Sequence, residues 1–210
     1  MDGISWITRN SGTSTGIYKI VFGNNIFVAV GLSGLILTSS DGISWATQTS
    51  ETSNNLQGIE YGNNKYIASG ASGTIITSQD GYSWILSNSG ISEHLINVDF
   101  LNGKYFIVGY SGTILSSDDG NSWTAIESGT SDVLRMSSYA DGIYVIVGNG
   151  GTILSSSDAN SWIKRTSGST SIFEGITNNQ NVSHNYNNDN STYQEIFRGE
   201  TQHTVTEGTN

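Results

Sequence analysis

The chain has 210 residues, of which 35% are hydrophobic and only 12% are charged, and its formal net charge is −10. The absence of cysteine excludes disulfides, thiolate metal sites and a cysteine nucleophile. The negative charge argues against nucleic-acid binding, and no apolar run is long enough for membrane insertion. Residues 1–3 do not begin a signal peptide, so we expect synthesis in the cytoplasm.

The five tryptophans reveal an internal repeat, because each lies 39 residues from the next. They are Trp6, Trp45, Trp84, Trp123 and Trp162. Their surroundings repeat in step as DGISW, DGISW, DGYSW, DGNSW and DANSW. A period of this length is typical of proteins built from a recurring supersecondary unit.

Each unit is predicted to form four short strands, which the third unit illustrates. Residues 94–100 alternate apolar and polar side chains, and 104–108 form an apolar run. Asn102 and Gly103 between them are a hairpin signal. Segments 113–116 and 122–126 complete the unit after turns at 109–112 and 118–120. We find no window with helical periodicity.

A recurring four-stranded antiparallel unit predicts an all-β fold, a β-propeller whose blades must stack to bury both faces. An open solenoid is the alternative. Residues 1–177 contain the repeats, and residues 178–210 contain an Asn-rich loop and two β-like segments. We predict five blades, with N- and C-terminal strands closing the last one. The alternatives are that residues 178–210 form an anchoring arm, or that the chain belongs to a longer repeat array.

The turn before each tryptophan resembles the Asp-box, or bacterial neuraminidase repeat, which reads Ser-x-Asp-x-Gly-x-x-Trp. Residues 116–123, SSDDGNSW, match it fully. In the other units Ser40, Gln79 and Ser157 replace its aspartate, and an aspartate follows one place later. The resemblance covers about residues 1–177 and implies a propeller. The family spans sialidases, lectins, photosystem assembly factors and phage tail proteins, so it implies little about activity.

We interpret the box residues as structural. An aspartate before glycine accepts backbone N–H groups of a tight turn, and the tryptophan is expected to pack between blades. The residues concerned are Asp41, Asp80, Asp118, Asp119, Asp158, Trp45, Trp84, Trp123 and Trp162. One carboxylate per turn provides too few ligands for a firm Ca²⁺ site, so we expect no metal and no cofactor.

The candidate ligand residues lie in the connections that vary between units. Strand order places the connection between units and the turn after the second strand on one face. Tyrosine, amide and acidic groups there suit a sugar, although a solvated polar rim without a ligand is the alternative. The candidates are Asn54, Asn55, Glu93, His94, Tyr110, Asp132, Arg135 and Asn149.

The preferred function is a non-catalytic binding module for glycan or a cell-surface receptor, as part of a phage or injection-type tail. The resemblance to repeats of phage tail and bacterial surface proteins implies this setting, in a virion or extracellular tail particle. The alternative is a structural or assembly protein that docks to a larger particle through its C-terminal segment. A sialidase-like glycoside hydrolase comes third, because the arginine triad of such enzymes is poorly matched by Arg9, Arg135, Arg165 and Arg198.

Overall fold

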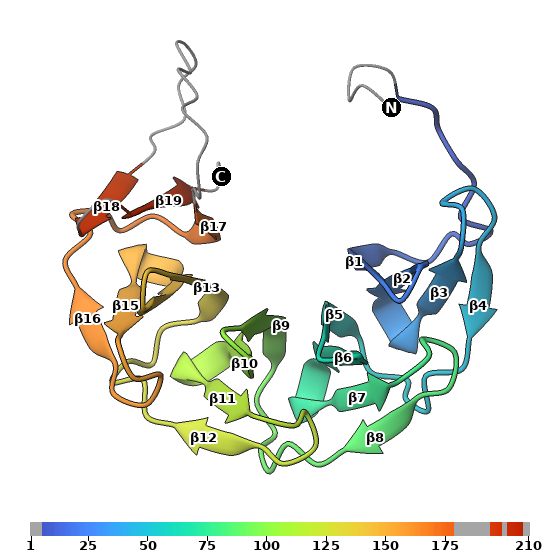
Figure 1. Ribbon diagram of the computed structural model, residues 1–210, viewed down its shortest axis with the longest axis horizontal. Coiled ribbons are helices and arrows are strands. Elements are labelled where there is room, and N and C mark those ends of the chain that lie inside the picture. The colour runs from blue at the N-terminus through green and yellow to red at the C-terminus, as the bar shows by residue number, and fades with distance from the viewer. Residues whose placement is uncertain (1–5, 179–193, 199–200, 208–210) are drawn as a thin grey trace.

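The protein forms five antiparallel β-sheets arranged radially around a central opening (Figure 1). A computed structural model describes residues 6–178, 194–198 and 201–207. The first two sheets contain β1 (Ile17–Gly23), β2 (Ile26–Gly31), β3 (Ile36–Ser39), β4 (Ala46–Gln48), β5 (Leu56–Gly62), β6 (Lys65–Gly70), β7 (Ile75–Ser78) and β8 (Ile85–Ser87). The third and fourth contain β9 (Leu95–Leu101), β10 (Lys104–Gly109), β11 (Ile114–Ser117), β12 (Thr124–Ile126), β13 (Leu134–Ala140), β14 (Ile143–Gly148), β15 (Ile153–Ser156) and β16 (Ile163–Arg165). The fifth contains β17 (Phe173–Asn178), β18 (Gln194–Arg198) and β19 (Thr201–Glu207).

Within each four-stranded sheet the strands follow chain order from the inside of the ring to the outside. The first hairpin of the third sheet turns at Asn102 and Gly103, where φ is 49° and 80°. Positive φ at both central residues gives a turn whose twist matches that of the flanking strands. The only helices in the described part of the chain are four three-residue 3-10 turns between the second and third strands, and none can span a membrane.

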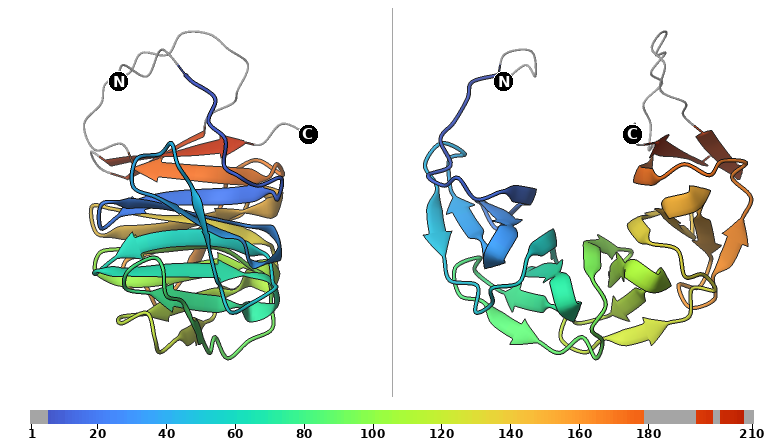
Figure 2. Two further views of the ribbon diagram at one scale, coloured as in Figure 1. Left: turned by 90° about the vertical axis from the view of Figure 1, so that its right-hand side faces the viewer. Right: turned by 180° about the vertical axis from the view of Figure 1, so that it is seen from behind.

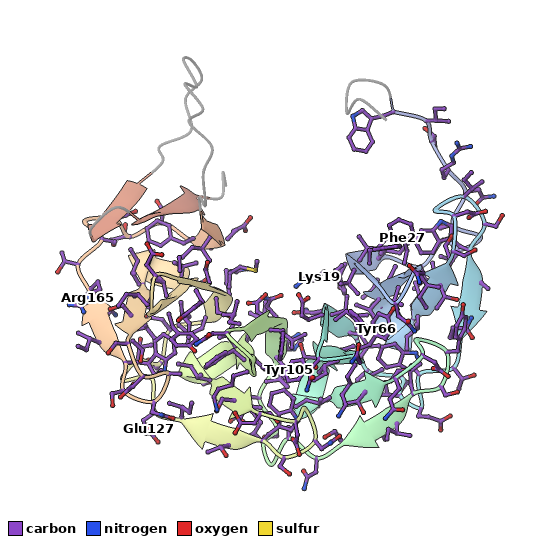
Figure 3. The ribbon with its side chains drawn as sticks, viewed as in Figure 1. Lys19, Phe27, Tyr66, Tyr105, Glu127 and Arg165 are labelled. Atoms are coloured by element: carbon purple, nitrogen blue, oxygen red, sulfur yellow. The ribbon has the colours of Figure 1, made fainter. Side chains whose placement is uncertain are left out.

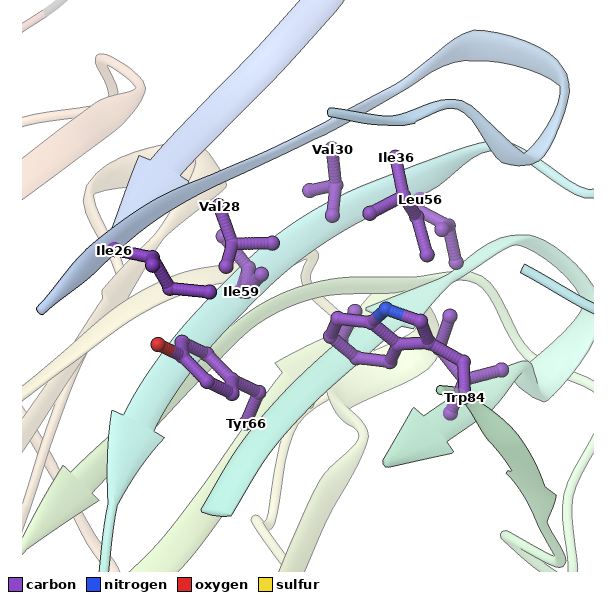
Figure 4. Close-up of a cluster of buried hydrophobic side chains, with 10 residues drawn as sticks. Ile26, Val28, Val30, Ile36, Leu56, Ile59, Tyr66 and Trp84 are labelled. Carbon is purple, nitrogen blue, oxygen red and sulfur yellow. The ribbon is translucent and has the colours of Figure 1, made fainter. Parts of the chain in front are cut away.

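The hydrophobic core is divided among the seams between neighbouring sheets (Figure 4). In the first seam, Ile26, Val28 and Ile36 of the first sheet pack against Tyr66 and Trp84 of the second. Alternate residues of each second strand enter opposite seams, because successive side chains of a strand point to opposite faces. Both faces of a middle sheet are therefore apolar, which explains why its strands read as nearly continuous apolar runs.

A tyrosine on the second strand crosses two of the seams. The Tyr66 hydroxyl donates to the backbone oxygen of Gly23 in the preceding sheet, and Tyr105 makes the equivalent bond to Gly62. A Cβ at Gly23 would lie 2.2 Å from the Tyr61 ring, so a side chain there would displace the aromatic packing of the next sheet. The glycine and the tyrosine thus act together to hold adjacent sheets at close distance.

The predicted all-β fold and four-stranded units are confirmed, but the predicted closure by the N-terminal strand is wrong for the described residues. Residues 6–16 belong to no sheet, and the Trp6 side chain is 88% exposed. The fifth sheet instead pairs β17 with β19 and β19 with β18, and the ring stays open (Figures 1 and 2). The physical reason is that four close-packed seams set the angles between sheets, and these angles leave the ends apart. The Asn-rich loop lies largely outside the described residues.

Candidate functional site

The turns between the third and fourth strands form one rim of the ring, the turn rim, defined by residues 40–44, 79–83, 118–122 and 157–161. In the second sheet, Asp80 Oδ1 accepts the backbone N–H groups of Tyr82 and Ser83, both at 2.8 Å. These two bonds lower the pKa of the Asp80 carboxyl below its ordinary value, and the bond from Ser83 has the larger effect. Ser78 Oγ donates to Asp80 Oδ1 at 3.0 Å and accepts from Gly81 N at 2.8 Å.

The same bonding recurs in the other sheets with the later aspartate and a serine two residues before it. The pairs are Ser39–Asp41, Ser117–Asp119 and Ser156–Asp158. Asp118, which completes the match to the Asp-box, is not the capping residue, because its carboxylate forms an exposed ion pair with Lys104. The sequence interpretation missed these serines, although the signal of a serine two places before the repeated aspartate is present in all four units.

The tryptophans differ in burial although they share one repeat position. Trp84 is 4% exposed, with its ring centroid 6.2 Å from that of Tyr66 and Nε1 donating to Gly81 O at 3.0 Å. Trp123 and Trp162 pack on the edges of the next two seams and are partly buried. Trp45 is also partly buried and lies beside Phe27.

The connections between sheets and the 3-10 turns form the opposite rim, which we call the loop rim (residues 49–55, 88–94, 127–133 and the turns 32–34, 71–73, 110–112, 149–151). Tyr110 N donates to His94 O of its own sheet at 2.9 Å, and Gly112 N donates to Asp132 O of the next connection at 2.9 Å. Equivalent bonds link the turns at 71–73 and 149–151 to the connections that follow them, from Gly73 N to Glu93 O and from Gly151 N to Ser171 O. This backbone belt holds the variable residues of adjacent sheets side by side.

Two candidate residues of the loop rim stack on each other. The ring centroids of His94 and Tyr110 are 5.1 Å apart with an interplanar angle of 31°, and Tyr110 is still 48% exposed. His94 Nε2 is buried and has no hydrogen-bond partner among the described residues. Glu93 precedes His94 in the chain and is half-buried, and its Oε2 accepts from Ser92 N at 3.2 Å. The exposed Tyr110 ring of this pair gives the loop rim an aromatic surface.

Asp132 and Arg135 are also brought onto this rim, but protein groups already engage them. Asp132 Oδ2 accepts from the hydroxyls of Thr152 and Thr130 and from Lys164 Nζ, the last at 3.0 Å. These bonds lower the pKa of the Asp132 carboxyl to about 2, and the bond from Thr152 has the largest effect. Arg135 Nε donates to Asn149 Oδ1 at 2.6 Å.

The junction of the first two sheets carries the remaining candidates. Asn55 Oδ1 accepts from Ser33 N at 2.9 Å, and Asn54 Nδ2 donates to Thr74 Oγ1 at 2.8 Å. A shallow surface hollow at this junction is lined in part by Leu32 and Glu51. Glu51 has φ of 60°, whereas the other units have glycine at its position. A non-glycine residue held at positive φ is strained, and such strain concentrates at functional sites.

A polar cluster on the inner strands was not predicted. Lys19 Nζ donates to Asn97 Oδ1 at 2.6 Å, and Asn97 Nδ2 donates to Asp99 Oδ2 at 2.7 Å. Ser137 Oγ donates to the same oxygen of Asp99 at 2.5 Å. Burial raises the pKa of the neighbouring Glu60 carboxyl, and the Lys19 charge opposes this rise. Figure 3 shows Lys19 pointing toward the centre of the ring. The available signal was the presence of charged side chains on strands that are otherwise apolar.

No group of three or more histidine, aspartate and glutamate side chains in the described chain is placed to hold a metal ion. Arg135 lies on inner strand β13, Arg165 on outer strand β16, and Arg9 precedes the first sheet, so these arginines do not converge.

The chain resembles several solved structures in its fold. YCF48 from Cyanidioschyzon merolae aligns with a TM-score of 0.64 and 13% identity over 97% of this chain and 71% of that chain. YCF48 bound to D1 peptide aligns with a TM-score of 0.61 and 17% identity over 78% of this chain. The computationally designed protein Ika8 gives a TM-score of 0.64 at 14% identity over 91% of this chain. The chain has the β-propeller fold.

Each alignment covers a larger share of this chain than of the chain to which it is compared. The match spans 57% of the YCF48 chain in the peptide complex and 58% of the Ika8 chain. No family model and no curated protein matches the sequence. Similarity at these identities shows the fold alone, because one fold carries many different binding surfaces.

Proposed function

We propose that this chain is a non-catalytic binding module that recognises glycan through the loop rim. The observation that carries the proposal is the contact between the His94 and Tyr110 rings, which leaves 48% of the tyrosine exposed. The apolar face of a sugar ring packs on an aromatic ring, and its hydroxyls need hydrogen-bond partners around that ring. Glu93, on the same connection as His94, supplies a carboxylate acceptor on this rim.

The arrangement favours several weak contacts along the rim over one deep pocket. Arg135 and Asn149 occupy the next junction, and Asn54 and Asn55 an earlier one. Repeated weak sites raise the overall affinity for a polymer without new contacts at any single site. A polysaccharide or a glycosylated receptor on a cell surface is therefore the ligand class we propose, with a phage or injection-type tail as the setting.

The proposal is tested with Tyr110→Ala and the matched control Tyr82→Ala. Tyr82 is 49% exposed, nearly the same as Tyr110, but lies on the turn rim. A glycan array identifies the oligosaccharide that the native chain retains, and titration calorimetry measures the affinity of each variant for it. We expect Tyr110→Ala to weaken binding by about 10-fold, as for a lost stacking ring, and Tyr82→Ala by less than about 2-fold.

The result also locates the face. A loss of binding in Tyr82→Ala but not in Tyr110→Ala would place the ligand on the turn rim and refute the assignment. Retention of no glycan by the native chain would remove glycan recognition altogether.

A protein ligand is the second candidate, because one of the structures with a similar fold is bound to D1 peptide. The loop rim exposes backbone turns and an aromatic ring that a polypeptide can also contact. Under this alternative the chain serves as an assembly factor. A native chain that retains no glycan but captures a polypeptide in a Tyr110-dependent manner would favour it.

A further inference from the structure

A β-bulge sets one residue apart near the start of each innermost strand. In β13 the pairing with β14 skips from Leu134 to Met136, so Arg135 has no partner in the ladder. A bulge takes its extra residue out of the regular alternation of a strand and re-aims the side chain. The same irregularity recurs in the other innermost strands at Tyr18, Gln57, Ile96 and Glu174. These bulge residues lie at the ends of the inner strands that border the loop rim.

Arg135 is the cation among the bulge residues, and its guanidinium is held in place without being neutralised. Its Nε donates to Asn149 Oδ1 of the same sheet at 2.6 Å, and the residue is half-buried. Among the described residues, neither Nη atom of Arg135 has a hydrogen-bond acceptor or a carboxylate within ion-pair distance. An arginine carries five N–H donors, four of them on the Nη atoms. The loop rim therefore contains an oriented guanidinium whose Nη donors are unused.

The acidic residues on neighbouring elements do not neutralise this guanidinium. Asp132 precedes Arg135 by three residues, but its carboxylate already forms an ion pair with Lys164 at 3.0 Å. Glu174, the bulge residue of the next sheet, is exposed and forms no ion pair with Arg135 in the described part of the chain. The net charge of −10 belongs to the whole chain, and charges more than about 8 Å apart are largely screened at physiological ionic strength. The immediate partner that Arg135 lacks is an anion.

Arg135 lies on an element next to the one that carries the exposed Tyr110 ring. Gly112 N, in the same 3-10 turn as Tyr110, donates to Asp132 O at 2.9 Å. The strand that begins two residues after Asp132 is β13, and it packs against this turn. Tyr110 and Arg135 thus belong to one continuous surface, and a saccharide that follows the loop rim inward can contact both.

A guanidinium recognises a carboxylate by geometry as well as by charge. Its planar fork donates two parallel N–H bonds to the two carboxylate oxygens, and a hydroxyl group cannot accept them in this way. A hexuronic acid carries the carboxylate directly on its pyranose ring. One such sugar therefore combines an apolar ring face, which suits an aromatic side chain, with a planar anion. A neutral sugar would leave the Nη donors to water.

We propose that the loop rim is specific for uronate-containing polysaccharide. Arg135 binds the carboxylate, Asn149 positions the guanidinium, and Tyr110 provides the stacking surface. The inference rests on the proposed glycan recognition and narrows its ligand class from sugars in general to acidic sugars.

The first experiment compares acidic oligosaccharides with neutral ones of the same skeleton. An array carries oligomers of galacturonate, glucuronate, mannuronate and guluronate, each beside its carboxyl-reduced form, and titration calorimetry measures the affinity of the native chain for both members of a retained pair. We expect carboxyl reduction to weaken binding by about 10- to 100-fold, because hydrogen bonds to a charged group are lost. Equal retention of both forms would overturn the uronate assignment and leave glycan recognition intact, whereas retention of neither would remove both.

The second experiment tests whether Arg135 is the residue that distinguishes the two forms. Arg135→Ala should bring the acidic oligomer to the affinity of its reduced form, and Arg135→Lys should restore only part of the preference, because an ammonium lacks the paired geometry. Arg165→Ala is the matched control. Arg165 is also half-buried, and its Nε donates to Ser155 Oγ at 2.7 Å, but it lies on outer strand β16 at the outer edge of the ring (Figure 3). Equal losses in Arg135→Ala and Arg165→Ala would refute the assignment.

Asn149→Asp separates recognition from a structural role of Arg135. The new carboxylate accepts from the guanidinium within the chain and so occupies it without removing it. We expect the preference for the acidic oligomer to fall by about 10-fold or more, while the urea midpoint stays the same or rises. An undiminished preference would overturn the proposal. Capture of an acidic polypeptide in an Arg135-dependent manner, by a native chain that retains no uronate, would assign the guanidinium to a protein carboxylate and refute the saccharide.

Discussion

Substitution of Tyr66 by phenylalanine tests whether hydroxyl bonds across the seams stabilise the ring. The Tyr66 side chain is fully buried, and its hydroxyl donates to Gly23 O in the preceding sheet. Tyr66→Phe removes only the hydroxyl and keeps the ring that packs 4.5 Å from Tyr61 and 6.2 Å from Trp84, measured between centroids. The change in stability should therefore report the hydrogen bond and not the aromatic packing.

The expected loss follows from the burial of both partners. A protein hydrogen bond contributes about 1 kcal/mol net, and a buried acceptor that loses its donor raises the cost, so we expect the free energy of unfolding to fall by about 1–2 kcal/mol. Tyr144→Phe should cost less, because its hydroxyl partner is the side chain of Asn102, at 3.0 Å, which can turn to water. Phe27→Tyr is the matched reverse change on the first sheet and should leave stability nearly unchanged, because no sheet in the described part of the chain packs on that face to offer an acceptor.

Urea denaturation followed by circular dichroism measures these differences, and alkaline titration gives a second readout. Burial raises the pKa of Tyr66 to about 12 from the ordinary 10. The folded state thus holds this proton more tightly than the unfolded state, so the associated stability is complete below pH 10 and is lost as the pH rises toward 12. Tyr66→Phe should reduce that alkaline loss. A cost below about 0.3 kcal/mol together with an unchanged alkaline profile would refute the cross-seam bond.

Three further predictions concern stability. Trp84→Ala removes a buried ring and should lower the free energy of unfolding by about 3–5 kcal/mol. Trp45→Ala should lower it by less, because the Trp45 ring is partly exposed. Equal losses of the two variants in urea melts would contradict the seam packing. Glu51→Gly relieves a positive φ and should raise stability by about 0.5–1 kcal/mol; a decrease would mean that the Glu51 side chain stabilises the junction. Backbone hydrogen bonds, of which that from Ser122 N–H has the largest effect, lower the pKa of Asp119 to about 2. The stability that the Asp119 carboxylate contributes is therefore present above about pH 4 and is lost as the pH falls toward 2. Asp119→Asn should make the thermal midpoint depend less on pH over that range, and an unchanged pH dependence would contradict the cap.

The repeat alone was sufficient to predict the sheets. Five tryptophans at one spacing, the hairpin signal at Asn102 and Gly103, and short apolar runs specify local strands and turns, which depend on neighbours in sequence. The predicted segments 104–108 and 113–116 agree with β10 and β11 within one residue at each end. The division of the rims was also predictable, since antiparallel order determines which connections share an edge.

The roles of individual site residues depended on distances that the sequence does not contain. The Asp-box resemblance pointed to Asp118, but the turn geometry uses Asp119, because only its carboxylate reaches the N–H groups of Asn121 and Ser122. The contact between Lys19 and Asn97 joins residues 78 positions apart, and no local pattern reports such a pair.

Ring closure is the property that only the tertiary structure decided. The count of repeat units is compatible with a closed ring, because residues 6–9 and the fifth sheet together make up one four-stranded unit. Whether the ends meet depends on the angle at each seam, which the packing of side chains such as Tyr66, Gly23 and Trp84 sets. Small differences in that angle add over successive seams, so the ring opens or closes through tertiary packing that strand propensity and repeat spacing do not encode.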